Sequence, residues 1–188
     1  FGCIGYSWSH CGTIMNLGVI DVTVQGQRYV GGVVGLNRGE ILNCYVTGSV
    51  SGNSYVGGMT GYNDSTVANT YAVVQTSGAE YVGGLAGVNQ GMVMNSYSLG
   101  GVSNAERAGG LVGYGTAPVN SLWDVEACGQ STSVGGGGRT SEQMKLPDTY
   151  AGWNPHDQVV WILDAGRDYP RLAWEGKPGE PIAPMDLG

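Results

Sequence analysis

Apolar residues along the chain form short runs that alternate with polar positions and are bounded by glycine, asparagine and serine. β-Branched residues are frequent within these runs, and pairs of glycine interrupt them at regular places. Glycine and β-branched residues disfavour helices, whereas short alternating runs between turn residues are typical of strands. The pattern therefore predicts an all-β chain built from short strands and tight turns.

A unit of 26 residues repeats four times. Residues 29–32, 55–58 and 81–84 all read Tyr-Val-Gly-Gly, residues 107–110 read Arg-Ala-Gly-Gly, and each copy starts 26 residues after the previous one. A third glycine follows in every copy. The repeated glycines are Gly31, Gly32, Gly35, Gly57, Gly58, Gly61, Gly83, Gly84, Gly87, Gly109, Gly110 and Gly113.

The second half of the unit repeats in the same phase. Asparagine recurs there as Asn43, Asn69, Asn95 and, after the loss of one residue, Asn120. Tyrosine recurs two residues later in the first three copies. Residues 12–16 resemble residues 39–43, so we expect a partial copy before the first full one.

Such short units do not enclose a core alone, and we expect them to stack as coils of a β-solenoid, each unit with two or three strands. The stack predicts an inward apolar row of Val33, Met59, Leu85 and Leu111. It also predicts an amide ladder of Asn43, Asn69, Asn95 and Asn120, and it places the repeated glycines at corners that need positive φ or close backbone approach. A sandwich or propeller of 26-residue hairpins is the alternative, although propeller blades usually need about 40 residues.

The amino-acid composition argues against several classes of function for this chain. The 188-residue chain has 35 glycines, 41% hydrophobic residues and a net charge of −7, which argues against disorder, nucleic-acid binding and attachment to anionic membranes. No run of 18 apolar residues predicts membrane insertion. The chain begins at Phe1, without Met or a signal peptide, as expected of a mature or excised segment.

The cysteines predict no metal site. Cys3 and Cys11 are close enough in sequence to form a small disulfide loop in an oxidising compartment, and we expect Cys44 and Cys128 to be small buried residues. The absence of CxxC pairs and of the calcium-binding nonapeptide predicts that the chain uses no zinc, calcium or other cofactor.

The sequence contains no convincing catalytic group. Asp124 and Glu126 form a near pair, and Asp164 and Asp168 flank a turn, but solvated or hydrogen-bonded loops explain both. His10 and His156 have no evident partners, and no Gly-x-Ser-x-Gly elbow exists. The sequence therefore predicts that the chain is not an enzyme. The one glycosylation sequon, at Asn63, is explained by a turn role.

The unit resembles the GLUG motif, in residues 29–37 and 41–45 and again from Tyr55 and Tyr81. The resemblance covers about residues 12–122. It implies a secreted bacterial, adhesin-like protein at the cell surface or outside the cell, with no catalytic residues in the repeat. Residues 121–172 resemble the segment that often closes such arrays, and residues 123–174 hold four of the five tryptophans.

These observations divide the chain into an N-terminal cap or partial coil (1–11), the repeats (12–122), a capping segment (123–174) and a linker or tail (175–188). We expect a non-catalytic structural or adhesive module, whose partner is a surface glycan, a protein or a second copy stacked end to end. The alternatives are a filament subunit, a carbohydrate-binding module with exposed Trp and Tyr faces, and an accessory region of a larger secreted hydrolase.

Overall fold

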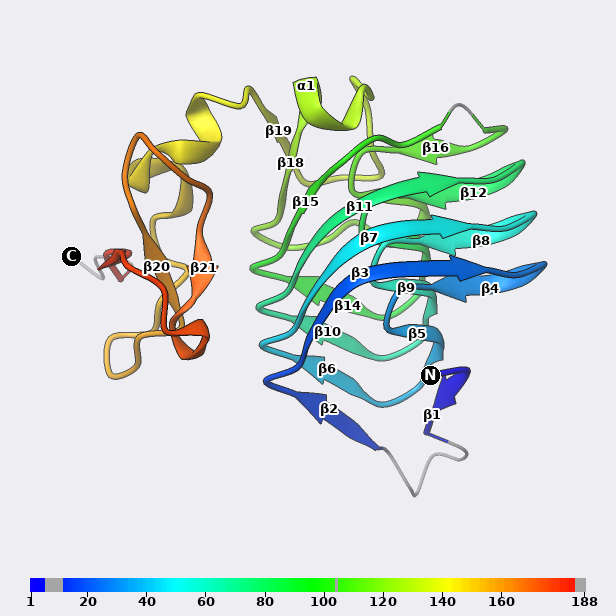
Figure 1. Cartoon of the computed structure of the whole chain (residues 1–188), viewed down its shortest axis with the longest axis horizontal. Helices are drawn as coiled ribbons and strands as arrows, with labels where there is room; N and C mark the ends of the chain where they lie inside the picture. The colour runs from blue at the N-terminus through cyan, green and yellow to red at the C-terminus, as the bar shows by residue number, and fades with distance from the viewer. Residues whose placement is uncertain (6–11, 104, 185–188) are drawn as a thin grey trace. The chain divides into compact units, whose positions relative to one another are not determined.

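The computed structural model describes residues 1–5, 12–103 and 105–184. These residues form two compact units, Phe1–Gly138 and Arg139–Gly188, and each unit is considered by itself. Strands dominate the first unit, and the second contains short strands and single-turn helices (Figure 1).

Four parallel sheets run along the first unit, and each full coil contributes one strand to each sheet. One sheet contains, in spatial order, β1 (Cys3–Ile4), β5 (Val34–Asn37), β9 (Thr60–Asn63), β13 (Ala86–Asn89) and β17 (Val112–Gly115). A second contains β14 (Met92–Met94), β10 (Thr66–Ala68), β6 (Glu40–Leu42) and β2 (Thr13–Met15).

The third sheet contains β19 (Gly137–Arg139), β18 (Leu122–Asp124), β15 (Tyr97–Leu99), β11 (Tyr71–Ser77), β7 (Tyr45–Ser51) and β3 (Gly18–Gln25). The fourth contains β16 (Ala108–Gly109), β12 (Glu80–Gly83), β8 (Ser54–Gly57) and β4 (Arg28–Gly31). The β3, β7 and β11 strands lie one above another (Figure 1).

The pairing register confirms the β-solenoid and its period. Val30 pairs with Val56, Val56 pairs with Val82, and Val82 pairs with Ala108, so each partner is one 26-residue repeat away. The sandwich and propeller alternatives are therefore wrong. Each of the first three coils has four short strands and not the predicted two or three, and the turns between consecutive strands of these coils are two residues long.

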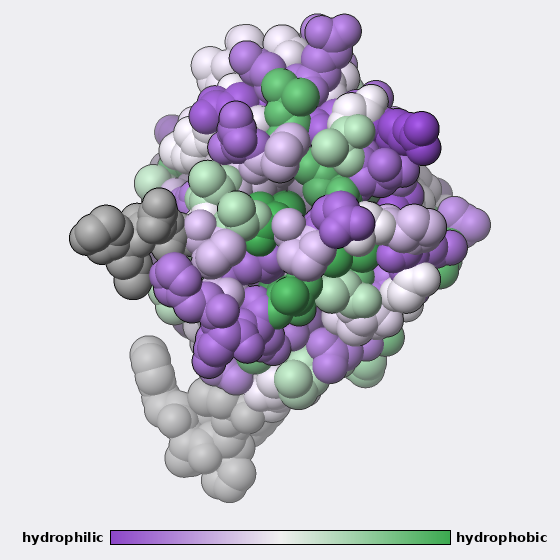
Figure 2. Space-filling view, turned by 90° about the vertical axis from the view of Figure 1, so that its left-hand side faces the viewer, coloured by the Kyte–Doolittle hydropathy of each residue, from purple (hydrophilic) through white to green (hydrophobic). Residues whose placement is uncertain are grey.

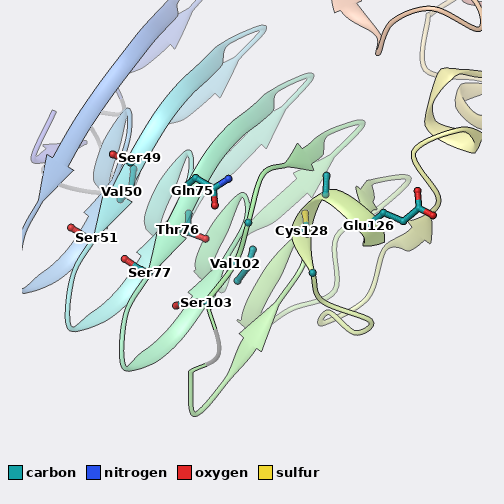
Figure 3. Close-up of a pocket in the computed structure, with 13 residues that line it drawn as sticks. Ser49, Val50, Ser51, Gln75, Thr76, Ser77, Val102, Ser103, Glu126 and Cys128 are labelled. Atoms are coloured by element: carbon teal, nitrogen blue, oxygen red, sulfur yellow. The ribbon is translucent and has the colours of Figure 1, made fainter.

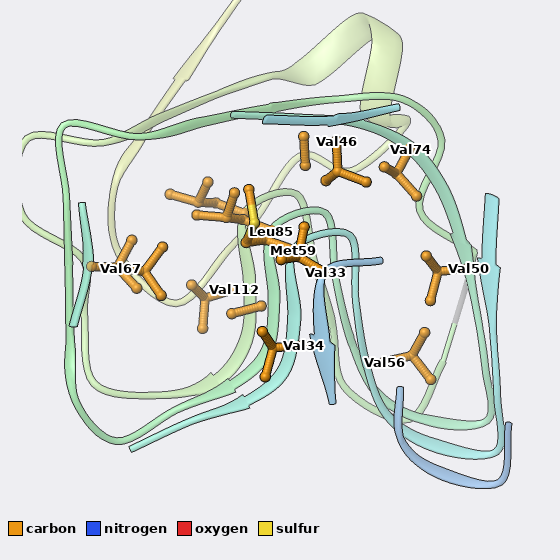
Figure 4. Packing of buried hydrophobic residues seen from close by; sticks show 14 of the residues in the cluster. Val33, Val34, Val46, Val50, Val56, Met59, Val67, Val74, Leu85 and Val112 are labelled. Carbon is orange, nitrogen blue, oxygen red and sulfur yellow. The ribbon is translucent and has the colours of Figure 1, made fainter. Parts of the chain in front are cut away.

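The predicted apolar row lies in the core of the first unit. Val33, Met59, Leu85 and Leu111 are all at most 1% exposed. Figure 4 shows Val33, Met59 and Leu85 together in the middle of the coil, between Val50 and Val56 on one side and Val67 and Val112 on the other. The row therefore fills the centre of every coil.

A partial coil precedes the first full one, as predicted. β2 pairs with β6, so Thr13 faces Glu40, and β1 pairs with β5, so Cys3 faces Leu36. Cys11 lies outside the described residues, and its disulfide with the exposed Cys3 stays a prediction.

Residues beyond the last repeat complete the first unit. β18 adds to β15, and the short helix α1 (Val125–Cys128) follows it. Trp123 is buried there and donates from Nε1 to the carbonyl oxygen of Gln130 at 3.0 Å. This segment supplies the final layer over the fourth coil.

The second unit has a small antiparallel sheet in the order β21 (Arg171–Leu172), β20 (Trp161–Leu163) and β22 (Glu180–Pro181). Its 3-10 helices are η1 (Gln143–Lys145), η2 (Pro147–Tyr150) and η3 (Ala173–Glu175). Residues that the composition assigns to a tail belong to this unit, because β22 pairs with β20 and Ile182 is only 2% exposed. The other sequence-based boundaries stay predictions.

Candidate functional site

The repeated glycines are needed for close backbone approach. A Cβ atom at Gly31 would lie 2.2 Å from the Val34 carbonyl oxygen, and one at Gly58 would lie 2.2 Å from the Gly84 carbonyl oxygen. None of the twelve repeated glycines has a positive φ. Of the two reasons that the sequence offers for glycine at these positions, close approach is therefore the correct one.

Positive φ falls instead on the neighbouring tyrosines and on the asparagine column. Tyr29, Tyr55 and Tyr81 have φ of 55°, 56° and 53°. Asparagine tolerates this left-handed conformation, but tyrosine rarely adopts it. The tyrosine rings stack on one another between coils, with centroids 4.9 Å apart for Tyr29 and Tyr55 and 5.1 Å for Tyr55 and Tyr81. This stacking helps to offset the backbone strain.

A continuous amide ladder forms in a different asparagine column from the predicted one. Asn37, Asn63 and Asn89 are completely buried. Asn37 Nδ2 donates to Asn63 Oδ1, and Asn63 Nδ2 donates to Asn89 Oδ1, both at 2.7 Å. Asn89 Nδ2 ends the ladder on the carbonyl oxygen of Thr116 at 2.9 Å. Buried inside this ladder, the Asn63 sequon has a structural role in the folded chain.

The predicted column of Asn43, Asn69, Asn95 and Asn120 mainly provides left-handed turn residues, with φ between 45° and 52°. Asn120 Nδ2 donates to Asn95 Oδ1 at 2.8 Å, but Asn43 Nδ2 donates to Asn16 Oδ1, and Asn69 Oδ1 is buried without a partner. The prediction of a continuous ladder there is wrong. The sequence contains the signal for the other column, which follows the third glycine of each unit at the same 26-residue spacing.

The tryptophans do not form an exposed row in the described part of the chain. Tyr45, Tyr71 and Tyr97 stack on one another at 5.0 and 5.1 Å, so their ring faces are occupied. In the second unit Trp153 and Trp161 are at most 1% exposed and pack edge to face. Trp123 is buried as well, and Trp174, at 41% exposed, stands without a second exposed tryptophan among the four of the predicted capping segment.

The acidic side chains that stand out in the sequence serve local structure. Asp124 caps α1 by accepting hydrogen bonds from the backbone N–H groups of Glu126 and Ala127, both at 2.9 Å. The Asp164 carboxylate pairs with Arg167 Nη1 at 4.0 Å, and the Asp164 backbone carbonyl oxygen closes the turn by accepting from the N–H groups of Arg167 and Asp168. His156 is exposed, and His10 lies outside the described residues.

The two buried cysteines are poor nucleophiles. Burial raises the pKa of the Cys128 thiol to about 12 and also raises the pKa of Cys44. Since the thiolate is the reactive form, neither thiol is activated. No group of three or more potential metal ligands occurs among the described residues.

A shallow hollow of about 420 Å³, with a mixed lining that is more apolar than polar, lies along β7, β11 and the residues after β15, beside α1. Figure 3 shows Ser49, Ser51, Ser77 and Ser103 in successive coils along it. Gln75 adds an amide, and Glu126 is the one ionisable carboxylate in its lining. Hydroxyl and amide groups both donate and accept hydrogen bonds, so the hollow suits an uncharged, hydroxyl-rich ligand.

Sequence reasoning missed this hollow. Its signal is the alternation Thr23-Val24-Gln25, Ser49-Val50-Ser51 and Gln75-Thr76-Ser77, in which polar residues flank an inward position. Figure 2 shows hydrophilic and hydrophobic residues interspersed on the face turned to the viewer. None of the helices in the described residues has the length and hydrophobicity of a membrane span.

The comparisons with known proteins concern the repeat and the fold. The GLUG motif family matches residues 26–51. A solved structure from Bacteroides ovatus, described as a "putative immunoglobulin A1 protease", is 20% identical with a TM-score of 0.63, over 92% of this chain and 62% of that chain. The chain thus spans less than two thirds of that protein, and the similarity concerns the fold alone. No curated protein is significantly similar in sequence.

The matched segment contains the Gly31–Gly32 pair and runs from the turn before β4 to the end of β7, which is one full coil. The structure stacks further copies of this coil in register at the same spacing. The chain therefore contains a GLUG motif at residues 26–51, within a β-solenoid whose coils repeat at the length of that motif.

Proposed function

We propose that the chain is a non-catalytic extracellular module with a structural and adhesive role. The observation that carries the proposal is that repeated polar side chains donate hydrogen bonds to the equivalent residues of the next coil. The ladder of Asn37, Asn63 and Asn89 is fully buried and uses both ends of the Asn63 amide. Residues repeated for this purpose support a rigid scaffold.

The hollow beside α1, with its row of serine hydroxyls, is the adhesive surface in this proposal. Its serines recur at the spacing of neighbouring strands, about 4.8 Å, so a chain-like ligand meets equivalent hydroxyls in consecutive coils. The near absence of charge in the lining favours a neutral surface glycan over a sulfated or sialylated one. Many weak, repeated contacts suit adhesion, because several copies on one surface bind through avidity.

Binding of the whole chain to an immobilised neutral polysaccharide, with an immobilised sulfated polysaccharide as the charged comparison, tests the adhesive role. Ser77→Tyr fills the hollow and is expected to weaken binding by about tenfold. Ser131→Tyr, at an exposed serine outside the lining, is the matched control and is expected to bind like the unmodified chain. Absence of binding to either surface would refute the adhesive role, and hydrolysis of peptide or glycan substrates would refute the non-catalytic one.

A second candidate is an accessory region of a larger secreted hydrolase. The similarity to the Bacteroides ovatus structure favours it, since that chain is longer than this one. An accessory region binds the substrate of its enzyme without cleaving it. The purified chain is therefore expected to retain immunoglobulin A1 in surface plasmon resonance and to leave it intact on a denaturing gel. Failure to retain immunoglobulin A1 would eliminate this candidate.

A further inference from the structure

Two columns of tyrosine meet on one outer face of the first unit, on either side of an inward bend in each coil. Figure 4 shows this bend at Val33, Met59 and Leu85, between the strands that enter it and those that leave it. β4, β8 and β12 carry the first column, and β9 and β17 carry the second. We call this set the tyrosine face, and its members are Tyr29, Tyr55, Tyr81, Tyr62 and Tyr114.

The tyrosine face is accessible to a ligand. Tyr114 is 43% exposed, and the other four tyrosines are half-buried. The three tyrosines of the first column have φ between 53° and 56°, a conformation that a bulky residue rarely adopts. Strained residues of this kind cluster where proteins contact ligands, so the conformation indicates that these rings serve more than packing within the coil stack.

Ring edges and hydroxyl groups make up most of the tyrosine face. The rings of the first column stack on one another, so their faces are covered. Tyr62 meets the rings of Tyr29 and Tyr55 edge-on, with centroids 5.8 and 6.1 Å apart. Arg28 Nη2 donates to the Tyr55 hydroxyl oxygen at 3.4 Å, which leaves the hydrogen of that hydroxyl available for another acceptor. Phenol and guanidinium groups together make the face rich in hydrogen-bond donors.

Positive and negative charges balance around the tyrosine face. Residues 1–138 contain three arginines and no lysine. The guanidinium of Arg28 lies 4.7 Å from the ring centroid of Tyr29, that of Arg107 lies 4.9 Å from the ring centroid of Tyr114, and Arg38 pairs with Asp64 at 3.8 Å. Two further acids lie in the same sheet column as Arg28, namely Glu80 and Glu106. The face therefore has no surplus positive charge to select an anionic ligand.

The second column alternates large and small side chains. Leu36, Tyr62, Val88 and Tyr114 pair in that order from one coil to the next. Tyr62 and Tyr114 are thus two strand spacings apart, or about 9.6 Å. A polyproline II helix rises about 9.3 Å in one turn of three residues. Every third residue of such a helix can therefore contact the two tyrosines in step.

We propose that the tyrosine face binds a proline-rich segment of a partner protein in the polyproline II conformation. Such a helix has no internal hydrogen bonds, so its carbonyl oxygens can accept from the tyrosine hydroxyls and from Arg28. Its rigid, apolar proline rings suit a face lined by aromatic side chains, and its neutrality suits the balanced charge. The inference is independent of the adhesive role of the hollow beside α1, because none of these residues lines that hollow.

Fluorescence anisotropy with a labelled decaproline peptide and the full chain tests the inference. We expect saturable binding that is insensitive to salt, since no net charge is paired. Tyr114→Ala removes the most exposed tyrosine of the face and is expected to raise Kd by about tenfold. Trp174→Ala removes an aromatic side chain of similar exposure, 41%, from the second unit and is the matched control, with unchanged Kd.

Absence of decaproline binding would overturn the inference, as would a Tyr114→Ala chain that binds as tightly as the unmodified one. Tighter, salt-sensitive binding of a polyglutamate peptide of the same length would show an anion site and would also overturn it. Two peptides of equal composition test the spacing: prolines at every third residue should bind about fivefold more tightly than prolines at every fourth. Equal binding of these two peptides would contradict the match between the coil spacing and the helix. Far-UV circular dichroism checks that each variant keeps the fold.

Discussion

A buried asparagine stabilises each unit, but the two side chains have different kinds of partner. In the coil stack, Asn63 bonds to the equivalent asparagines of the coils on either side. In the second unit, Asn154 Nδ2 donates to the carbonyl oxygens of Trp161 and Ile182, and its Oδ1 accepts from the N–H groups of Val160 and Trp161. The first interaction is repeated and shared between coils, and the second occurs once and joins distant segments.

The cores differ in the same way. The coil stack fills its centre with one apolar residue per coil, such as Val33 and Met59. The second unit packs Tyr150, Trp153 and Trp161 edge to face, and Tyr150 donates its hydroxyl hydrogen to the Met144 carbonyl oxygen at 2.6 Å. A repeat array distributes its stability over nearest neighbours, whereas a small unit depends on a few large residues.

Removal of the Asn154 side chain should have the largest effect. Asn154→Ala leaves four buried backbone groups without their partner, and we expect the second unit to lose about 3–5 kcal/mol, enough to unfold it. Amide exchange followed by NMR should show loss of protection in β20 and β22. Loss of protection in β7 and β11 as well would contradict the distinction between the two units.

A methyl group at Gly58 should disturb the coil stack next most strongly. In Gly58→Ala the new Cβ lies 2.2 Å from the Gly84 carbonyl oxygen and 3.0 Å from Ala72 Cβ, and we expect a loss of about 3 kcal/mol. Gly2→Ala is the control, because nothing lies within 4 Å of its Cβ. Urea unfolding of both variants gives the difference, and equal midpoints would refute the role of close approach.

Breaking the amide ladder should lower the free energy of unfolding by less than Gly58→Ala does. Asn63→Ala removes the acceptor for Asn37 and the donor for Asn89, and we expect a loss of about 2 kcal/mol. A double-mutant cycle with Asn89→Ala should show coupling, since the two side chains share one bond. Asn53→Ala, at an exposed asparagine, is the control. Additive effects would show that the ladder has no energetic role.

One substitution should stabilise the stack. Thr76 occupies a column of buried valines, with Val50 and Val102 beside it, and its hydroxyl is buried without a partner. Thr76→Val should therefore raise the free energy of unfolding by about 1 kcal/mol. Thr76→Ser keeps the hydroxyl and should not stabilise. Thermal unfolding of both variants checks the sign.

The smallest effect concerns acid sensitivity of the second unit. Burial alone would raise the pKa of Asp168, but its hydrogen bond with Arg171 prevails and lowers it below the usual value of 3.8. Because the folded pKa is depressed, the pair stabilises the unit above pH 3.8 and this contribution is lost as the pH falls through the folded pKa. Since Asp168 is largely exposed, the loss should stay below about 1 kcal/mol. In Asp168→Asn the acid-dependent part of the unfolding free energy should disappear.

The 26-residue period makes the contacts of the coil stack predictable from the sequence, whereas the contacts of the second unit cannot be predicted in this way. Residues repeated in phase have to face one another in a stack, and this rule alone correctly predicts that Val33 and Met59 share one buried row. The 26-residue period does not indicate which of the two asparagine columns is buried, because burial depends on how the coil bends between β5 and β6. The partners of Asn154 are up to 28 residues away and occur once, so no pattern in the sequence indicates them.

Residue-resolved amide exchange in Asn63→Ala tests the central claim, that repeated side chains hold neighbouring coils together, most directly. The account predicts faster exchange in the coils of Asn37 and Asn89, which flank the substitution 26 residues away on either side, and unchanged exchange around Asn154. Faster exchange confined to the residues next to Asn63 in sequence, or spread equally through the second unit, would contradict it.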